Sequence, residues 1–92
     1  MINKVDLTKA KKDIKKVPLH VRMKLFGWVD DVEDRGLEEV RKTPGYHDEP
    51  LKGKRAGQRS IRLTIAYRAI YIEKKDKGIE FVSVEEVNKH DY

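Results

Sequence analysis

The spacing of the apolar residues changes midway along the sequence, from every third or fourth position to every second position. The first spacing is typical of amphipathic helices, and the second is typical of strands with one buried face. The order of the two patterns predicts helices in the first half of the chain and a sheet in the second half. A chain of 92 residues has too little interior for two separate cores. We therefore expect a single domain over residues 1–92.

Two helices are predicted in the first half. Thr8 is a candidate N-cap of a short helix. Its apolar side is formed by Ala10, Ile14 and Val17. Pro18 suits the first turn of a longer helix, and Gly36 is placed to end it. The apolar stripe of this longer helix comprises Val21, Met23, Leu25, Phe26, Trp28, Val29 and Val32. A last helical turn is expected over residues 37–41, before 43-TPG-45 breaks it.

Three strands are predicted after a charged loop. The loop covers residues 44–57, the strands cover 60–66, 67–73 and 79–87, and the turn 74-KKDKG-78 joins the last two strands. Consecutive strands with short connections form an antiparallel meander, to which Val5 and its neighbours could add an edge strand. The expected fold is α+β, with an N-terminal strand and two helices packed on one face of an antiparallel sheet.

Alternation along the predicted strands separates apolar from basic side chains. Ile61, Leu63 and Ile65 fall on one face, and Arg62 and Thr64 fall on the other. Arg68 is a second candidate for that other face. Helices that cover the apolar face would leave a concave, basic sheet surface. Tyr67 and Tyr71 share one strand face and are expected to pack in the sheet rather than to stack on bases.

Positive charge is concentrated in one segment. Residues 50–72 contain six cations and no acid, whereas the whole chain has a net charge of +5. The cations are Lys52, Lys54, Arg55, Arg59, Arg62 and Arg68. Such a segment favours an anionic partner, for which nucleic acid, an acidic protein and a membrane surface are all candidates. We interpret the absence of acids as a means of keeping this surface positive towards a polyanion.

Several classes of protein are disfavoured by what the sequence lacks. With no cysteine, it has neither disulfides nor a cysteine-based zinc site, which fits a cytoplasmic protein. No apolar run approaches the roughly 20 residues that span a bilayer, and 1-MINKVDLTKAKK-12 does not resemble a signal peptide. His20 and His47 have no ligand spacing, and His47, Asp48 and Glu49 would point in different directions in an extended loop. We expect no metal, no cofactor and no membrane association.

Five segments together resemble a known family. They are VDLTKAKKDIKKVP, 49-EPLKG-53, RSIRL, YRAIY and the terminal NKHDY. In combination they resemble the RelE/ParE toxins of bacterial type II toxin–antitoxin modules, and 49-EPLKG-53 followed by RSIRL and YR is most similar to the HigB and YoeB messenger-RNA interferases. The resemblance covers nearly the whole chain. It implies a small RelE-like fold and a metal-independent endoribonuclease.

The resemblance also implies roles for individual residues. Arg68 matches a phosphate-binding arginine, Lys52 a functional lysine and Glu49 a general base. A planar guanidinium can bind two phosphate oxygens at once, which suits Arg68 to the scissile phosphate. The proton donor is left open among His90, Asp91 and Tyr92. Further RNA contacts are expected from Lys54, Arg55, Arg59, Arg62 and Lys89.

The leading hypothesis is a toxin that cleaves messenger RNA in the ribosomal A site and so inhibits translation. A gyrase inhibitor of the ParE type and a catalytically inert relative that binds only its antitoxin are the alternatives. The implied partners are a cognate antitoxin, the ribosome and messenger RNA. Because no segment resembles a helix-turn-helix, operator DNA is expected to be bound only through the antitoxin.

Overall fold

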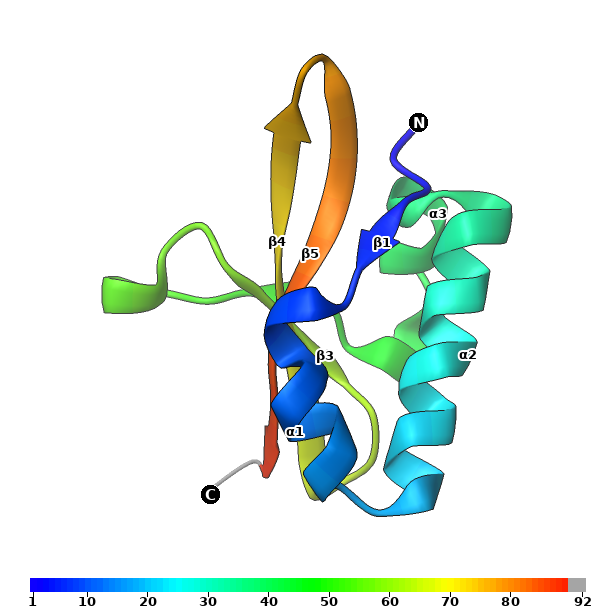
Figure 1. Ribbon diagram of the computed structural model, residues 1–92, viewed down its shortest axis with the longest axis vertical. Coiled ribbons are helices and arrows are strands. Elements are labelled where there is room, and N and C mark those ends of the chain that lie inside the picture. The colour runs from blue at the N-terminus through cyan, green and yellow to red at the C-terminus, as the bar shows by residue number, and fades with distance from the viewer. Residues whose placement is uncertain (90–92) are drawn as a thin grey trace.

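The computed structural model describes residues 1–89 as a five-stranded sheet with helices packed on one of its faces (Figure 1). The α-helices are α1 (Lys11–Lys16), α2 (Leu19–Arg35) and α3 (Leu37–Arg41). Short 3₁₀ turns are η1 (Thr8–Ala10), η2 (Pro44–Tyr46) and η3 (Gly53–Arg55). The strands are β1 (Val5–Asp6), β2 (Glu49–Pro50), β3 (Arg59–Arg62), β4 (Tyr67–Asp76) and β5 (Ile79–Lys89). The predicted α+β class is confirmed.

The sheet is mixed, which corrects the expectation of a purely antiparallel one. Its strand order is β1-β5-β4-β3-β2, and β2, β3, β4 and β5 pair antiparallel in sequence. β1 occupies the predicted edge but runs parallel to β5, with Val5 opposite Val82. The two strands are separated in sequence by the helices and the other strands. A connection of this length permits parallel pairing, which a tight hairpin does not.

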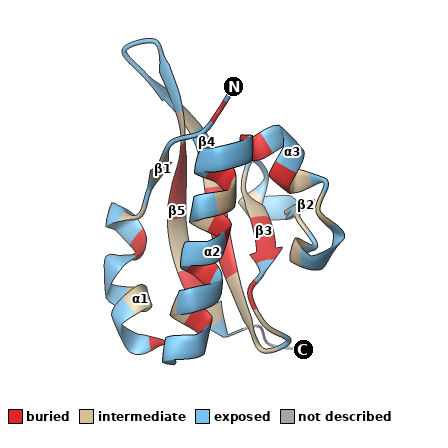
Figure 2. Ribbon diagram, turned by 90° about the vertical axis from the view of Figure 1, so that its right-hand side faces the viewer, coloured by how far each residue is buried: buried red, intermediate tan, exposed pale blue. Residues whose placement is uncertain are grey.

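Helix α2 provides most of the cover for the sheet (Figure 2). Four residues of its predicted stripe are fully buried: Val21, Leu25, Trp28 and Val32. The indole of Trp28 packs on the ring of Tyr71 in β4, with 5.3 Å between ring centroids. Met23 and Phe26 were wrongly included in the stripe, because they are 62% and 42% exposed. At about 100° per residue they lie on the side of α2 turned away from the sheet.

The helix starts differ from the prediction at two positions. Pro18, expected in the first turn of α2, lies just before that turn as the N-cap. Thr8 does not cap the first helical segment with its side chain; instead its N–H donates to Asp6 Oδ1 at 2.9 Å. The hydrogen bonds from Thr8 hold the pKa of Asp6 below its ordinary value. Gly36 ends α2 as predicted, with φ of 85°, and a side chain here would collide with Met1. The predicted turn over residues 37–41 is α3.

Strand β3 is shorter than predicted because a threonine diverts the backbone. The predicted strand reached residue 66, but β3 ends at Arg62. The hydroxyl oxygen of Thr64 accepts hydrogen bonds from the N–H groups of Ala66 and Tyr67 at 3.2 and 3.1 Å. Such local bonds compete with ladder pairing. As a result Ile65, expected on the buried face, is 77% exposed.

The β4–β5 hairpin is longer than predicted. Its strands pair as far as Asp76 opposite Ile79, so the connection is the two residues Lys77 and Gly78 instead of five. Both have positive φ, 51° and 83°. Two such residues in succession form the tight turn whose twist matches paired strands.

The outer edge of β5 is covered by two different elements. β1 pairs with residues 82 and 83 of β5. Further along, the α1 carboxylate of Asp13 accepts a hydrogen bond from the backbone N–H of Val87 at 3.1 Å. One further N–H group of this edge is therefore satisfied by a side chain.

Replacing Trp28 with alanine should lower the free energy of unfolding by about 3–5 kcal/mol, since a large buried ring leaves a cavity against Tyr71. Urea unfolding followed by far-ultraviolet circular dichroism measures this. Met23→Ala, on the exposed side of the same helix, is the control and should change stability by no more than about 0.5 kcal/mol. Equal losses in the two variants would contradict the assignment of the core stripe.

Candidate functional site

The face of the sheet opposite α2 carries the two arginines expected there. In β3 and β4, Ile61 lies opposite Ala69, and both side chains are in the core. Arg62, one residue after Ile61, lies opposite Arg68, one residue before Ala69, and alternation turns both arginines to the other face. We call this the open face. Figure 1 shows the segment around η3 projecting from the sheet on the side away from α2.

A solvent-open hollow at the β2–β3 side of the sheet gathers four chemically active side chains. Glu49, Arg62 and Arg68 line it, as does His47, which follows η2. The structure thus brings together the predicted base and two predicted phosphate ligands. His47 was considered only as a metal ligand in the sequence analysis. No spacing pattern marks it, because its proximity to Arg62 and Arg68 arises from pairing between β2 and β3 and between β3 and β4.

Arg68 is oriented by a chain of hydrogen bonds across the open face. Its Nε donates to Asn88 Oδ1 at 3.3 Å, and Asn88 Nδ2 donates to Glu86 Oε1 at 2.8 Å. Within residues 1–89, neither terminal nitrogen of the Arg68 guanidinium has a hydrogen-bond partner. Asn88 therefore binds the Nε side of the guanidinium and leaves its two terminal nitrogens available. The sequence analysis missed Asn88, which lies 20 positions away.

Glu86 corrects the interpretation that the cationic surface is free of acids. It comes from β5, and its carboxylate binds Arg55, with Nη1 to Oε2 at 2.8 Å and Nη2 to Oε1 at 3.4 Å. Arg55 Nη1 also donates to Gln58 Oε1 at 3.0 Å. The Arg55 hydrogen bond lowers the pKa of Glu86, and the same bond raises the pKa of Arg55. Residues 50–72 lack acids in sequence, but their surface does not lack them in space.

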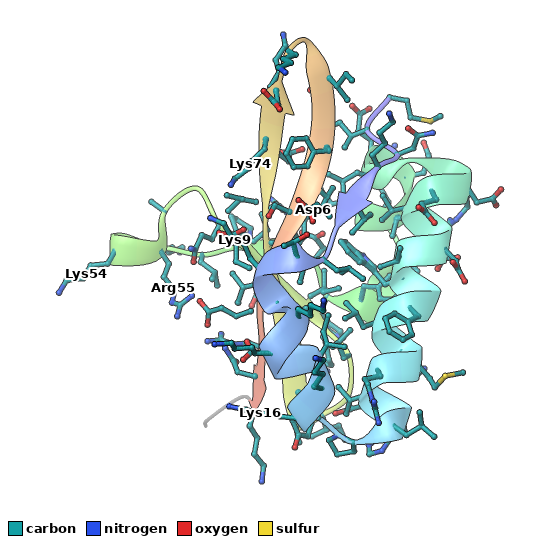
Figure 3. The ribbon with its side chains drawn as sticks, in the orientation of Figure 1. Asp6, Lys9, Lys16, Lys54, Arg55 and Lys74 are labelled. Carbon is teal, nitrogen blue, oxygen red and sulfur yellow. The ribbon has the colours of Figure 1, made fainter. Side chains whose placement is uncertain are left out.

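Lys52 and Lys54 lie apart from the hollow, on a projecting segment. Leu51 N–H donates to the carbonyl of Gln58 at 2.9 Å and closes this segment, which we call the arm (residues 51–58). Lys54 is near its outer end and points away from the sheet, whereas Arg55 is tied to β5 (Figure 3). Neither lysine lines the hollow. A partner would have to contact the arm and the hollow separately.

Arg59 is on the opposite side of the sheet from Arg62 and Arg68. Its Nε donates to Asp48 Oδ1 at 2.6 Å, and the Asp48 side chain is only 1% exposed. Tyr71 donates its hydroxyl to the other carboxylate oxygen, also at 2.6 Å. Burial, and then the hydrogen bond to Asp48, raise the pKa of Tyr71. The expected RNA ligand Arg59 is therefore engaged in an internal ion pair.

The other predicted residues fall at or beyond the end of β5. Lys89 is exposed and lies opposite Tyr67 in the sheet. His90, Asp91 and Tyr92 lie outside the described residues. Over residues 1–89, no group of three or more histidines, aspartates or glutamates is placed to hold a metal ion. No helix in this part of the chain is long and apolar enough to cross a membrane.

The Arg55–Glu86 pair predicts a pH-dependent contribution to stability. The pKa of Glu86 in the folded protein is lower than its ordinary value of 4.5. The pair therefore stabilises the fold above pH 4.5, and this contribution is lost as the pH falls through the folded pKa. Glu86→Gln should lower the free energy of unfolding by less than about 1 kcal/mol near pH 6, since the pair is partly exposed. The deficit should shrink towards pH 3 in urea titrations. Glu33→Gln, at an exposed α2 position, is the control, and a deficit independent of pH would contradict this account.

Comparison with known proteins identifies the fold. The sequence matches no protein-family model and no curated protein. Among solved structures, it is similar to the YoeB/ParE toxin from Agrobacterium tumefaciens, with a TM-score of 0.65, 21% identity, and coverage of 99% of this chain and 100% of that one. YafQ from E. coli has a TM-score of 0.65 at 20% identity, covering 95% of this chain and 90% of that chain.

A third similar structure is a toxin–antitoxin complex, RelBE2 from Mycobacterium tuberculosis. The TM-score is 0.59 at 22% identity, with coverage of 98% of this chain and 100% of the matched chain. The three matches extend over nearly all of this chain. The protein therefore has the fold shared by the YoeB, ParE, RelE and YafQ toxins.

Proposed function

We propose that this protein is the toxin of a type II toxin–antitoxin system and a metal-independent endoribonuclease that cleaves messenger RNA on the ribosome. The observation that carries the proposal is the meeting of Glu49, Arg62 and Arg68 in one hollow on the uncovered face of a toxin fold. A carboxylate and two guanidinium groups supply a base and positive charge. These are two of the requirements for RNA cleavage by an internal nucleophile.

In the proposed reaction, the Glu49 carboxylate takes the proton of a ribose 2′-hydroxyl. The 2′-oxygen attacks the adjacent phosphorus, and the guanidinium groups of Arg62 and Arg68 stabilise the charge that develops on the phosphate oxygens. Arg68 binds the phosphate with the two terminal nitrogens that Asn88 leaves unoccupied among the described residues. The bond from phosphorus to the 5′-oxygen then breaks.

The openness of the site supports the proposed ribosome dependence. A hollow that faces solvent places few constraints on a flexible single strand, so the 2′-hydroxyl is seldom in line for attack. A ribosome-bound codon arrives in a fixed conformation, which converts a rare geometry into a frequent one. Lys52 and Lys54 on the arm would contact the RNA backbone outside the reacting nucleotides.

An antitoxin is the second proposed partner. One similar structure is a toxin–antitoxin complex. Arg62, Lys52 and Lys54 form no ion pair with other residues in the described part of the chain, and such a surface suits an acidic segment that covers it. Operator DNA would be bound through the antitoxin. Covering the open face would block RNA access and so neutralise the toxin.

Arg68→Ala should reduce messenger cleavage by about 10²–10³-fold, the usual cost of losing one group that stabilises transition-state charge. Primer extension on a defined messenger, with and without ribosomes, measures it. Lys12→Ala, which removes a cation at an exposed position of α1, is the control and should cleave normally. Cuts that persist in Arg68→Ala would contradict the catalytic assignment. Absence of cuts with the native protein, together with inhibition of gyrase supercoiling, would replace the proposal with the ParE-type activity.

Glu49→Gln should lower the single-turnover cleavage rate on programmed ribosomes by about 10²–10⁴-fold, because an amide cannot accept the 2′-proton. Glutamine keeps the size of the side chain, so binding to ribosomes, measured by co-sedimentation, should be nearly unchanged. A loss of binding equal to the loss of rate would assign Glu49 to recognition instead of proton transfer.

A further inference from the structure

The backbone of His47 is in an uncommon conformation at the rim of the hollow. Its φ and ψ are 45° and 47°, and only one other non-glycine residue among residues 1–89, Lys77, has a positive φ. Lys77 belongs to the tight β4–β5 turn, which requires that conformation. His47 ends η2, where its N–H donates to the carbonyl of Pro44 at 3.1 Å. Glycine or asparagine would end the turn more easily, so the imidazole contributes nothing that the turn needs.

The residue after His47 fixes this arrangement. Asp48 is buried, with one carboxylate oxygen bound by Arg59 and the other by Tyr71, both at 2.6 Å. Immediately afterwards, Glu49 and Pro50 pair with β3. The chain is thus anchored on the core side at Asp48 and along the sheet at β2. His47 and Glu49, on either side of the anchor, both line the hollow.

The proposed cleavage leaves one proton unaccounted for. The 5′-oxygen that leaves phosphorus needs a proton, and neither arginine can supply it, because a guanidinium stays protonated in proteins. Tyr67 packs against the core. Ser60 and Thr64 also line the hollow, but their hydroxyl groups are weak acids. Imidazole is the side chain best suited to give a proton in neutral water. Among the described residues that line the hollow, His47 is the one imidazole.

We propose that His47 donates this proton and completes the acid–base pair with Glu49; the inference rests on the proposed ribonuclease activity. The Glu49 carboxylate takes the proton from the 2′-hydroxyl, the bond from the 2′-oxygen to phosphorus forms, and the bond from phosphorus to the 5′-oxygen breaks. The protonated imidazole of His47 gives its proton to that 5′-oxygen. The products are a 2′,3′-cyclic phosphate and a 5′-hydroxyl, and a proton exchange with water resets both side chains.

The test compares two messengers that differ by one atom at the cleaved bond. In the second messenger, sulfur replaces the 5′-bridging oxygen, and a thiolate leaves without a proton. His47→Asn is the informative variant because asparagine tolerates the left-handed backbone of this position. On programmed ribosomes, it should cleave the oxygen messenger about 10²–10⁴-fold more slowly than the native protein. It should cleave the sulfur messenger at close to the native rate.

Three further variants make the result decisive. Arg68→Ala should be slow on both messengers, because it removes phosphate binding and not the proton donor. His20→Asn, at an exposed position of α2, should be normal on both. If His47→Asn is normal on the oxygen messenger, or equally slow on both, His47 is not the donor. Rescue by sulfur of His90→Asn instead would assign the proton to the C-terminus. If the native protein cleaves neither messenger, the proposed function itself fails, and the role of His47 with it.

Discussion

The limited number of helices in this small chain determines the rest of the structure. One helix of 17 residues, α2, is the only α-helix among residues 1–89 long enough to span the sheet. It buries Val21, Leu25, Trp28 and Val32 against one face. The described residues contain no comparable helix for the second face, so Arg62 on that face stays exposed to solvent. Strand alternation then separates the residues into a core set and a set available to a partner.

Polar residues reinforce this division from both sides. On the core side, Asp48 accepts hydrogen bonds from Tyr71 and Arg59, so a cation and an acid cancel within the fold. On the open face, Glu86 binds Arg55 and, through Asn88, orients Arg68. Asp48 and Glu86 therefore have different roles, although each binds a neighbouring arginine. One fixes the loop that carries His47 and Glu49, and the other limits how much positive charge is free.

The elements that could be predicted from the sequence are those specified by residues close together in the chain. The buried positions of α2 repeat at helical spacing, Gly36 ends that helix, and α3 needs only the few residues between two breaks. The motif positions Glu49, Arg62 and Arg68 were also found from the sequence, and the sheet places them around one hollow. Features that depend on competing hydrogen bonds or distant partners were missed. Thr64 ends β3 through its hydroxyl, and the position of His47 depends on Arg59 and Tyr71, which anchor Asp48 from far along the chain.

The carboxylate of Asp13 on the backbone of Val87 has a consequence for self-association. An unpaired strand edge is a template on which a second chain can add a strand, and repeated addition produces fibrils. β1 is too short to cover β5 along its length, and α1 brings an acid to an N–H group that it leaves open. A second molecule that approached this edge would meet a group already bonded and a negative charge. The bond from Asp13 thereby disfavours the addition of a second chain at this part of the β5 edge.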